Sequence, residues 1–368
     1  MSLDLGVVAL VIWLAAAAVY RWLALRAVDA HLKPRANQAE AVPPGGEVVL
    51  LRPLRGAGQW LESCLESLWS AASLSQTRVV LGLTDPRDPA RRIVEEAIAA
   101  AKRPPTQLRI APGPAALNRK MANLIQMTEG LEAEILLFSD ADVRVPDDYV
   151  DRAIAPFKET GVGLVTFPYR SVPGSSLASR TEALITNTHF LPSVAMALEL
   201  QGLHFALGAS IGVRREALER AGGLEALLGV CGDDYEMARN IERAGYRLEL
   251  VPLMLEHHVE GAGWHDSASR QLRWARVTRA ERPRGYLGQG VTHGAIPALA
   301  LGAVAAFSGA GAASWLLPLA WWAAQAAGLW RRRGILALRG ADLLLLPLVD
   351  VAAFLVWLGG CFGRPRPS

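Results

Sequence analysis

Cysteine is scarce in this chain, and its scarcity excludes two kinds of site. The three cysteines, Cys64, Cys231 and Cys361, are odd in number and far apart. They therefore predict neither a disulfide framework nor a Cys-x-x-Cys zinc site, which agrees with a reducing cytoplasm. Internal repeats are also missing, and a Pro/Gly linker at 42–46 is the one biased segment. The net charge is only +3, and we expect no nucleic-acid partner.

A positively charged leader is missing as well, although the chain begins with an apolar run. No charged residue occurs from Leu5 to Tyr20, and the run reaches about Leu25 if Arg21 snorkels. A cleaved signal peptide is the alternative, but only Asp4 is charged before the run. We therefore predict a transmembrane helix within residues 1–26. The basic residues that follow it place the next domain in the cytoplasm.

Apolar residues, 51% of the 368, are also concentrated near the C-terminus. Residues 291–330 predict a hairpin of two spans with a break around 309–312, followed by three arginines at 331–333. A third run, 341–361, contains Asp342 and Asp350, which are costly in lipid. It is either a span or a re-entrant or interfacial segment. We expect a multi-pass membrane protein with its catalytic domain on the cytoplasmic side.

Between the apolar ends, short apolar runs alternate with helical patterns, which predicts an α/β domain with a parallel sheet at 46–262. A helical stretch at 176–200 lies either against the membrane or in the core. The strands are expected near 48–53, 79–85, 108–110, 135–139, 162–167, 207–213 and 248–251, and the helices near 59–72, 88–101, 118–128, 214–218 and 232–244.

Carboxylates follow two of these strands. Asp140 and Asp142 come directly after the apolar run 135–138 and share one face of an extended chain. Hard oxygen ligands at a strand end favour a divalent ion that holds a diphosphate, although such a pair is often only a polar turn. Asp85 ends the second strand and would contact a base or ribose. Asp88 has the alternative role of capping the next helix.

A second acidic pair, Asp233 and Asp234, begins a predicted helix. Acidic residues at a helix start are ordinary caps. The helix is followed by another strand, so a carboxylate here could face the same sheet edge and act as a general base.

Arginines recur at three-residue spacing in the predicted interfacial segment 263–290. Arg270, Arg273 and Trp274 belong to this stretch. A basic helix beside a membrane span binds anionic lipid heads. An Arg next to a Trp can also neutralise a diphosphate.

In this order, these landmarks resemble the ceramide glucosyltransferase family over nearly the whole chain. The resemblance implies a catalytic domain of the nucleotide-diphospho-sugar transferase (GT-A) fold with transmembrane helices at both ends. It matches family positions at Asp85, Asp140, Asp234 and Arg270-x-x-Arg273-Trp274, and also at Lys120, Asn123 and His189.

The resemblance implies an inverting transfer of a sugar, glucose first, from a UDP-sugar to a membrane lipid such as ceramide. Asp85 would hold the uridine, Asp140 and Asp142 the Mn²⁺ or Mg²⁺ with the diphosphate, and Asp234 would be the base. Lys120, Arg270, Arg273 and Trp274 would bind the donor.

Two departures keep other acceptors open. Asp142 completes an Asp-x-Asp that the animal ceramide enzymes lack, and Asp233 stands where they have Glu. Bacterial relatives of similar length glycosylate hopanoids, so a UDP-GlcNAc-dependent hopanoid glycosyltransferase is the alternative. A non-catalytic membrane scaffold is a further alternative. A processive polysaccharide synthase is disfavoured, because its longer set of C-terminal spans is missing.

Overall fold

The computed structural model describes residues 2–33, 46–100, 103–261 and 263–365. They form two compact units. The sheet unit lies within residues 34–169 and 201–260, and the helical unit comprises the described parts of 1–33, 170–200 and 261–365. Of the predicted linker at 42–46, residues 42–45 lie outside the described residues.

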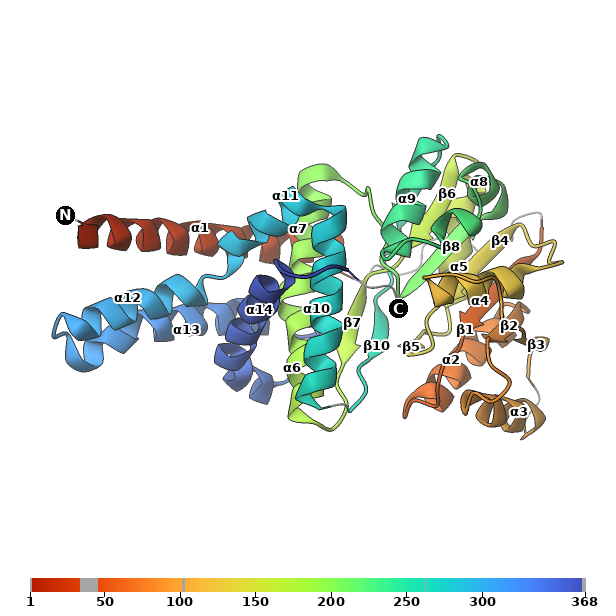
Figure 1. The fold of residues 1–368 in the computed structure, drawn as a ribbon, viewed down its shortest axis with the longest axis horizontal. Coiled ribbons are helices and arrows are strands. Elements are labelled where there is room, and N and C mark those ends of the chain that lie inside the picture. Colours follow the sequence, from red (N-terminus) through yellow and green to blue (C-terminus); the bar gives the residue numbers. More distant parts are fainter. Residues whose placement is uncertain (1, 34–45, 101–102, 262, 366–368) are drawn as a thin grey trace. The chain divides into compact units, whose positions relative to one another are not determined.

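A seven-stranded sheet organises the sheet unit, in the order β3-β2-β1-β4-β8-β6-β9 (Figure 1). Its strands are β1 (Val48–Pro53), β2 (Arg78–Leu83), β3 (Thr106–Ile110), β4 (Ile135–Ser139), β6 (Val162–Thr166), β8 (Ser210–Arg214) and β9 (Arg247–Leu250). The expectation of an all-parallel sheet was wrong for β8, which runs antiparallel to both β4 and β6. A short apolar run fixes burial but carries no direction, because direction depends on the connection.

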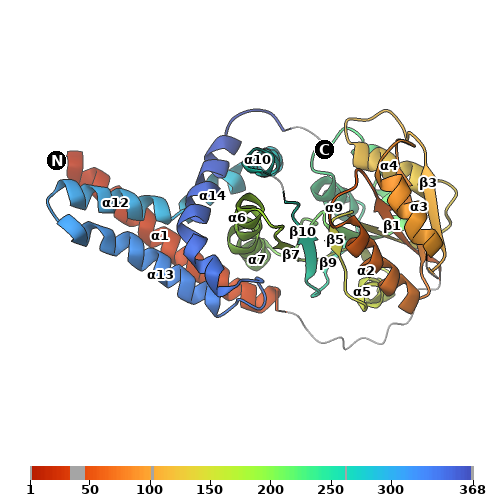
Figure 2. The ribbon, with the colours of Figure 1, turned by 90° about the horizontal axis from the view of Figure 1, so that it is seen from below.

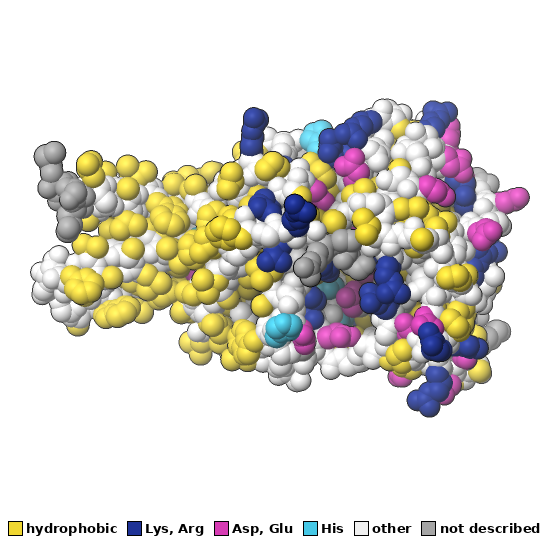
Figure 3. Space-filling model, viewed as in Figure 1, with side chains coloured by type: hydrophobic (Ala, Val, Ile, Leu, Met, Phe, Trp, Pro, Cys, Tyr) yellow, Lys and Arg dark blue, Asp and Glu magenta, His cyan; other side chains and the backbone are white. Residues whose placement is uncertain are grey.

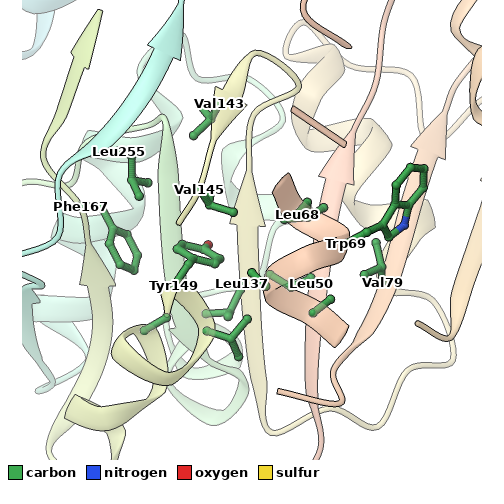
Figure 4. Packing of buried hydrophobic residues seen from close by; sticks show 14 of the residues in the cluster. Leu50, Leu68, Trp69, Val79, Leu137, Val143, Val145, Tyr149, Phe167 and Leu255 are labelled. Carbon is green, nitrogen blue, oxygen red and sulfur yellow. The ribbon is translucent and has the colours of Figure 1, made fainter. Parts of the chain in front are cut away.

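Helices cover both faces of this sheet. One face carries α2 (Leu61–Leu74), α3 (Ala90–Ala100) and α5 (Tyr149–Ile154), and the other carries α4 (Arg119–Thr128), α8 (Arg215–Arg220) and α9 (Asp233–Arg243). Successive strand side chains point to opposite faces, so Leu50 joins the first core while Val49 and Leu51 join the second. The first core also contains Leu137, Tyr149 and Phe167 (Figure 4). Both faces of the sheet are therefore buried.

Several short elements of the sheet unit were not predicted. They are β5 (Val143–Arg144), β10 (Leu255–His258), η1 (Ala155–Lys158) and η3 (Glu225–Leu227), together with α5 and with β7 (Tyr169–Val172), which ends in the other unit. The antiparallel pairing of β5 with β10 aligns His257 with Val143. This register brings a histidine to the turn that follows β4.

Apolar helices make up most of the helical unit, in which α1, α12 and α13 lie side by side (Figure 2). Its elements are α1 (Ser2–His31), α6 (Leu177–Ile185), the π-helix η2 (Thr186–Phe190), α7 (Leu191–Gln201), α10 (Trp264–Glu281), α11 (Pro283–Gly288), η4 (Gln289–Thr292), α12 (Ala295–Phe307), η5 (Gly311–Trp315), α13 (Leu316–Trp330), η6 (Gly340–Leu345) and α14 (Leu346–Gly360). The predicted helix at 176–200 is thus interrupted by a π-helical turn.

On the face that Figure 3 shows, hydrophobic side chains cover much of the surface of α1, α12 and α13. Among the described residues, Leu5–His31 and Gly340–Gly360 are long and apolar enough to cross a membrane. A third span results if residues 283–292 and 295–307, which are bent by 42°, count as one. The last predicted run, 341–361, therefore contains a helix of sufficient length. The helical unit is compatible with association with a membrane.

Candidate active site at the carboxyl edge of the sheet

Two carboxylates follow β4, at the edge where the parallel strands β1 and β2 also end. The amide of Asp140 donates to the carbonyl of Ala209 at 3.0 Å, and that of Val143 donates to the carbonyl of Asp140 at 3.2 Å. This turn leaves the side chains of Asp140 and Asp142 35% and 46% exposed. The carboxyl edge of an open α/β sheet is the usual ligand site, so both groups are available to a ligand.

A buried arginine fixes the conformation of this turn. Arg52 lies on β1 and is 0% exposed. Its guanidinium donates to Oγ of Ser139 at 2.9 Å, to the carbonyl of Val143 at 2.8 Å and to the carbonyl of Cys64 at 2.6 Å. It therefore joins the residue before Asp140 to the residue after the turn. No motif marks Arg52, and the one signal is a charged residue in an apolar strand.

Lys120 connects the turn to α4. The side chain of Asn118 accepts the amide of Met121 at 3.1 Å and so caps this helix. In the first turn, Nζ of Lys120 lies 2.6 Å from Oδ1 of Asp140 and 3.9 Å from Oδ2 of Asp233. Burial opposes the ammonium charge, but Asp140 and Asp233 outweigh it and raise the pKa of Lys120 above its ordinary value. Lys120 is thus a fixed cation among the carboxylates.

The two acidic residues of α9 point to different neighbours. Asp233 accepts Nδ2 of Asn118 at 3.2 Å and faces Lys120. Asp234 accepts the amide of Tyr235 at 2.8 Å, whereas a capping side chain accepts an amide two or three positions farther on. The N-cap is Gly232, which makes no side-chain cap. The helix-cap interpretation of Asp234 therefore has no support in this geometry.

The surroundings of Asp234 make it a better base than an ordinary aspartate. Burial, followed by the charge of Asp233, raises the pKa of Asp234 to about 6. A group with this pKa remains mostly ionised at neutral pH and holds a proton more strongly. A Cβ atom on Gly208 would lie 2.9 Å from Oδ2 of Asp234, so any larger residue at this position would crowd the carboxylate. The charge of Asp140 also contributes to the raised pKa of Asp234, so the two carboxylates lie within electrostatic range of each other.

Two further residues of the site come from segments without a recognisable motif. Nε2 of His257 lies 3.4 Å from Oδ2 of Asp142, and the ring of Tyr169 lies edge-on to His257 at 5.7 Å. Partial burial opposes the charge of Asp142, but His257 outweighs it and lowers the pKa of that carboxyl. Burial, followed by the charge of Asp234, raises the pKa of Tyr169. A histidine pair at 257–258 was the available sequence signal.

Asp85 and Asp88 have different roles. Asp85 follows β2 and accepts the amide and Nε of Arg87 at 2.9 and 3.2 Å; these bonds lower its pKa. Asp88 accepts the amide of Gly56 through both carboxylate oxygens and the amide of Ala90. The capping interpretation of Asp88 is therefore favoured. Asp85 remains partly exposed, with 44% of its side chain accessible.

The predicted donor-binding residues Arg270, Arg273 and Trp274 lie on α10, in the helical unit. Within that unit, the guanidinium of Arg270 donates to both oxygens of Glu182, at 3.0 and 2.7 Å. Oγ of Ser267 donates to the same carboxylate at 2.6 Å. Arg270 thus neutralises a buried glutamate.

Two later arginines of α10 are also used inside the helical unit. Nε of Arg276 donates to the carbonyl of Phe362 at 2.9 Å, and Arg279 donates to the carbonyl of Cys361 at 2.5 Å. Both carbonyls follow α14, where cations stabilise the negative end of the helix. Part of the basic stretch therefore stabilises this helix end.

The two carboxylates that follow β4 fit a divalent ion that arrives with a diphosphate. Among the residues in the described ranges, no group of three or more His, Cys, Asp or Glu side chains is arranged to hold a metal. Asp140 and Asp142 offer hard oxygens. Mg²⁺ is commonly bound by one or two carboxylates, with phosphates and waters completing its shell.

Comparison with known proteins agrees with this architecture. The family model described as glycosyl transferase family 21 matches residues 8–365. The structure of a mannosyltransferase from Pyrobaculum calidifontis, in complex with GDP-Man and Mn²⁺, is 18% identical, with a TM-score of 0.52 over 97% of this chain and 98% of that one. Glucosyl-3-phosphoglycerate synthase from Mycobacterium tuberculosis, in complex with Mn²⁺, UDP and phosphoglyceric acid, is 15% identical, with a TM-score of 0.41 over 64% of this chain and 78% of that one. The predicted GT-A fold is confirmed.

Proposed function

We propose that this chain, which belongs to glycosyl transferase family 21 and is a nucleotide-sugar glycosyltransferase, transfers a sugar from a UDP-sugar to a hydroxyl of a membrane lipid. The transfer would invert the configuration of the anomeric carbon. Glucose is the proposed sugar and ceramide the proposed lipid. One observation carries the proposal: Lys120 and Asp140 form a 2.6 Å ion pair in the same site as Asp234, whose pKa is raised to about 6.

The donor would lie along the carboxyl edge of the sheet. Asp85 would contact the uridine, and Lys120 would place its fixed charge beside the diphosphate. Asp140 and Asp142 would hold Mn²⁺ or Mg²⁺, which neutralises negative charge on the leaving group when bound. Arg52 supports this arrangement, because its hydrogen bonds to Ser139 and Val143 keep the turn in one conformation.

Asp234 would act on the acceptor. As the lipid oxygen forms its bond to the anomeric carbon, the bond from that carbon to the UDP oxygen breaks, and the hydroxyl proton passes to the carboxylate of Asp234. A pKa of about 6 reduces the mismatch between an ordinary aspartate and an alcohol proton. Arg273 and Trp274 would stabilise the departing UDP.

We propose further that the protein is multi-pass with the sheet unit in the cytoplasm. Arg332 forms an ion pair with Asp29 at 2.5 Å, within the helical unit. This pair joins the end of α1 to the end of α13. The basic residues after both helices therefore share one side, as the positive-inside rule requires for a cytoplasmic face.

A hopanoid is the second candidate acceptor, with UDP-GlcNAc as donor. The departures from the animal ceramide enzymes at Asp142 and Asp233 loosen the link to ceramide. Both residues lie in the site, beside His257 and Lys120 respectively, so the departures concern the donor and the base rather than a distant surface.

The test reconstitutes the full chain in vesicles with labelled UDP-glucose or UDP-GlcNAc and with ceramide or bacteriohopanetetrol. Extracted lipids are then analysed by mass spectrometry. We expect a single hexosylated lipid, which the Asp234→Asn variant should form roughly 10² to 10⁴ times more slowly. A scaffold predicts no lipid-linked sugar with any pair. UDP-GlcNAc transfer to the hopanoid, without glucosylceramide, would replace the first candidate by the second.

A further inference from the structure

A group of polar and ionisable side chains lies among the apolar helices of the helical unit. We name it the inner polar cluster: Arg21 of α1, His189 of η2, His293, Gln325 of α13 and Asp350 of α14. His293, Gln325 and Asp350 are only 8%, 5% and 4% exposed. Ionisable residues inside apolar helices are costly and often functional, so their contacts decide what the cluster does.

Asp350 is bound unevenly. Trp322 and Gln325 donate to its Oδ2 at 3.0 and 2.8 Å, and Trp321 does so at 3.4 Å. Oδ1 lies 3.2 Å from Nε2 of His189 and accepts no hydrogen bond from the described part of the chain. One carboxylate oxygen is therefore nearly saturated, whereas the other has capacity for a further donor.

The position of His189 is set by the π-helical turn. Oγ1 of Thr188 donates to the carbonyl of Leu184 at 2.7 Å and lies 3.0 Å from Nδ1 of His189. A hydroxyl has one proton, so Thr188 must accept from Nδ1. Nε2 then faces Oδ1 of Asp350, at 3.2 Å. A π-helical turn often marks a functional position.

Buried nitrogen atoms next to this pair have no partner in the described part of the chain. Nε and Nη2 of Arg21 and Nδ1 of His293 are buried without a hydrogen bond, while Nη1 of Arg21 donates to the carbonyl of Thr188 at 2.5 Å. The ring of His293 stacks near that of His189, at 6.2 Å. The charges of Arg21 and Asp350 also interact. Buried polar atoms are usually paired, so these atoms indicate a ligand.

Another buried aspartate in the same C-terminal region shows how a purely structural group is satisfied. Asp342 is 5% exposed. It lies 2.6 Å from Nη2 of Arg180, accepts Nε of Arg180 at 2.8 Å, and accepts the amide of Arg339 at 2.6 Å. Both of its oxygens are occupied. The inner polar cluster differs because donors and an acceptor remain available together.

We propose that the inner polar cluster binds a hydroxyl of the lipid substrate, separate from the hydroxyl that receives the sugar. A hydroxyl can donate to Oδ1 of Asp350 and accept from Arg21 or His293, whereas a phosphate would bring negative charge next to Asp350 and a hydrocarbon would satisfy neither group. The proposal rests on the lipid acceptor of the proposed function. The acceptor would then be a lipid with at least two hydroxyls.

The test compares how tightly two lipids bind to the full chain in nanodiscs. One is N-hexadecanoyl sphinganine, and the other is the same lipid without its secondary hydroxyl. We expect the diol to bind about 10-fold to 100-fold more tightly, because the analogue leaves buried groups unpaired. Asp350→Asn and His293→Phe should each reduce this preference to within about 3-fold of unity.

His293→Phe separates a ligand role from a structural one. Nδ1 of His293 has no partner in the described protein, and phenylalanine keeps the contacts with Phe354 and Trp357. A structural role therefore predicts no change in preference. The matched control is Asp342→Asn, an identical change at a fully paired aspartate, which should keep the preference. Equal binding of both lipids to the wild type, no binding of either, or an unchanged preference in folded His293→Phe would overturn the proposal.

Sugar transfer is measured separately on the same samples. Discrimination without any transfer to a lipid would support this binding site and refute the proposed function. Transfer without discrimination would support the proposed function and refute this site.

Discussion

Asp234→Asn should lower turnover and raise stability at the same time. Asparagine keeps the shape of the side chain but cannot accept the proton, so kcat should fall by roughly 10² to 10⁴, with donor binding near normal. Catalysis and stability change in opposite directions here, because burial and Asp233 make the ionised Asp234 unfavourable in the folded protein. A helix cap would behave differently, since asparagine caps about as well as aspartate.

The stability effect can be estimated from the pKa. A pKa of about 6 against the ordinary 3.8 corresponds to up to about 3 kcal/mol, at about 1.4 kcal/mol per pH unit. The folded state binds this proton more tightly than the unfolded state. The resulting stabilisation is complete below about pH 4 and is lost as the pH rises through 6. Above pH 6, asparagine removes the cost of the buried charge.

Thermal unfolding and turnover of the purified variant provide the assay. We expect a higher Tm than wild type at pH 7.5, no difference near pH 4, and the stated loss of kcat. Asp233→Asn is the control. Asp233 accepts a hydrogen bond from Asn118, and we expect its substitution to lower kcat less than Asp234→Asn does. Near wild-type turnover of folded Asp234→Asn would refute the reasoning and make Asp233 the next candidate. Lower turnover together with a lower Tm would indicate that the variant loses activity because its fold is destabilised.

Five further predictions concern the other parts of the site and the membrane. EDTA should abolish turnover, and Mn²⁺ or Mg²⁺ should restore it. The Asp140→Asn variant should bind the UDP-sugar donor more weakly in calorimetry. Full activity in EDTA would contradict the role of Asp140 as a metal ligand. Arg52→Met should lower the free energy of unfolding by several kcal/mol, because three hydrogen bonds of a buried cation are lost; an unchanged Tm would contradict the role of Arg52. Gly208→Ala should reduce kcat at least about 10-fold by crowding Asp234, while donor affinity stays constant. A protease site inserted at Gly45 should be cleaved only from the cytoplasmic side, and cleavage from outside would overturn the charge argument.

The regular elements and the acidic residues of the site could be predicted because their signals are local. Apolar runs ending in Asp85 and Asp140 identified strands and their carboxyl edge, since burial on both faces requires continuous apolar sequence. The direction of β8 could not be read this way, because its residues Ser210–Arg214 give the same pattern in either direction.

The residues that complete the site escaped prediction because they depend on tertiary contacts. His257 reaches Asp142 through the pairing of β10 with β5, and Arg52 is explained only by its three acceptors. The π-helical turn at His189 likewise leaves no mark in the periodicity of the surrounding helix. Longer-range pairing decides such positions, and a sequence pattern records only which face is apolar.

The most direct test of the proposed reaction is the anomeric configuration of the product. The purified full chain is incubated with ceramide and with UDP-glucose, in which glucose is α-linked to the diphosphate. The extracted glycolipid is then analysed by NMR. A single direct attack assisted by Asp234 predicts a β-glucoside. An α-glucoside, or free glucose with no lipid-linked sugar, would contradict the account.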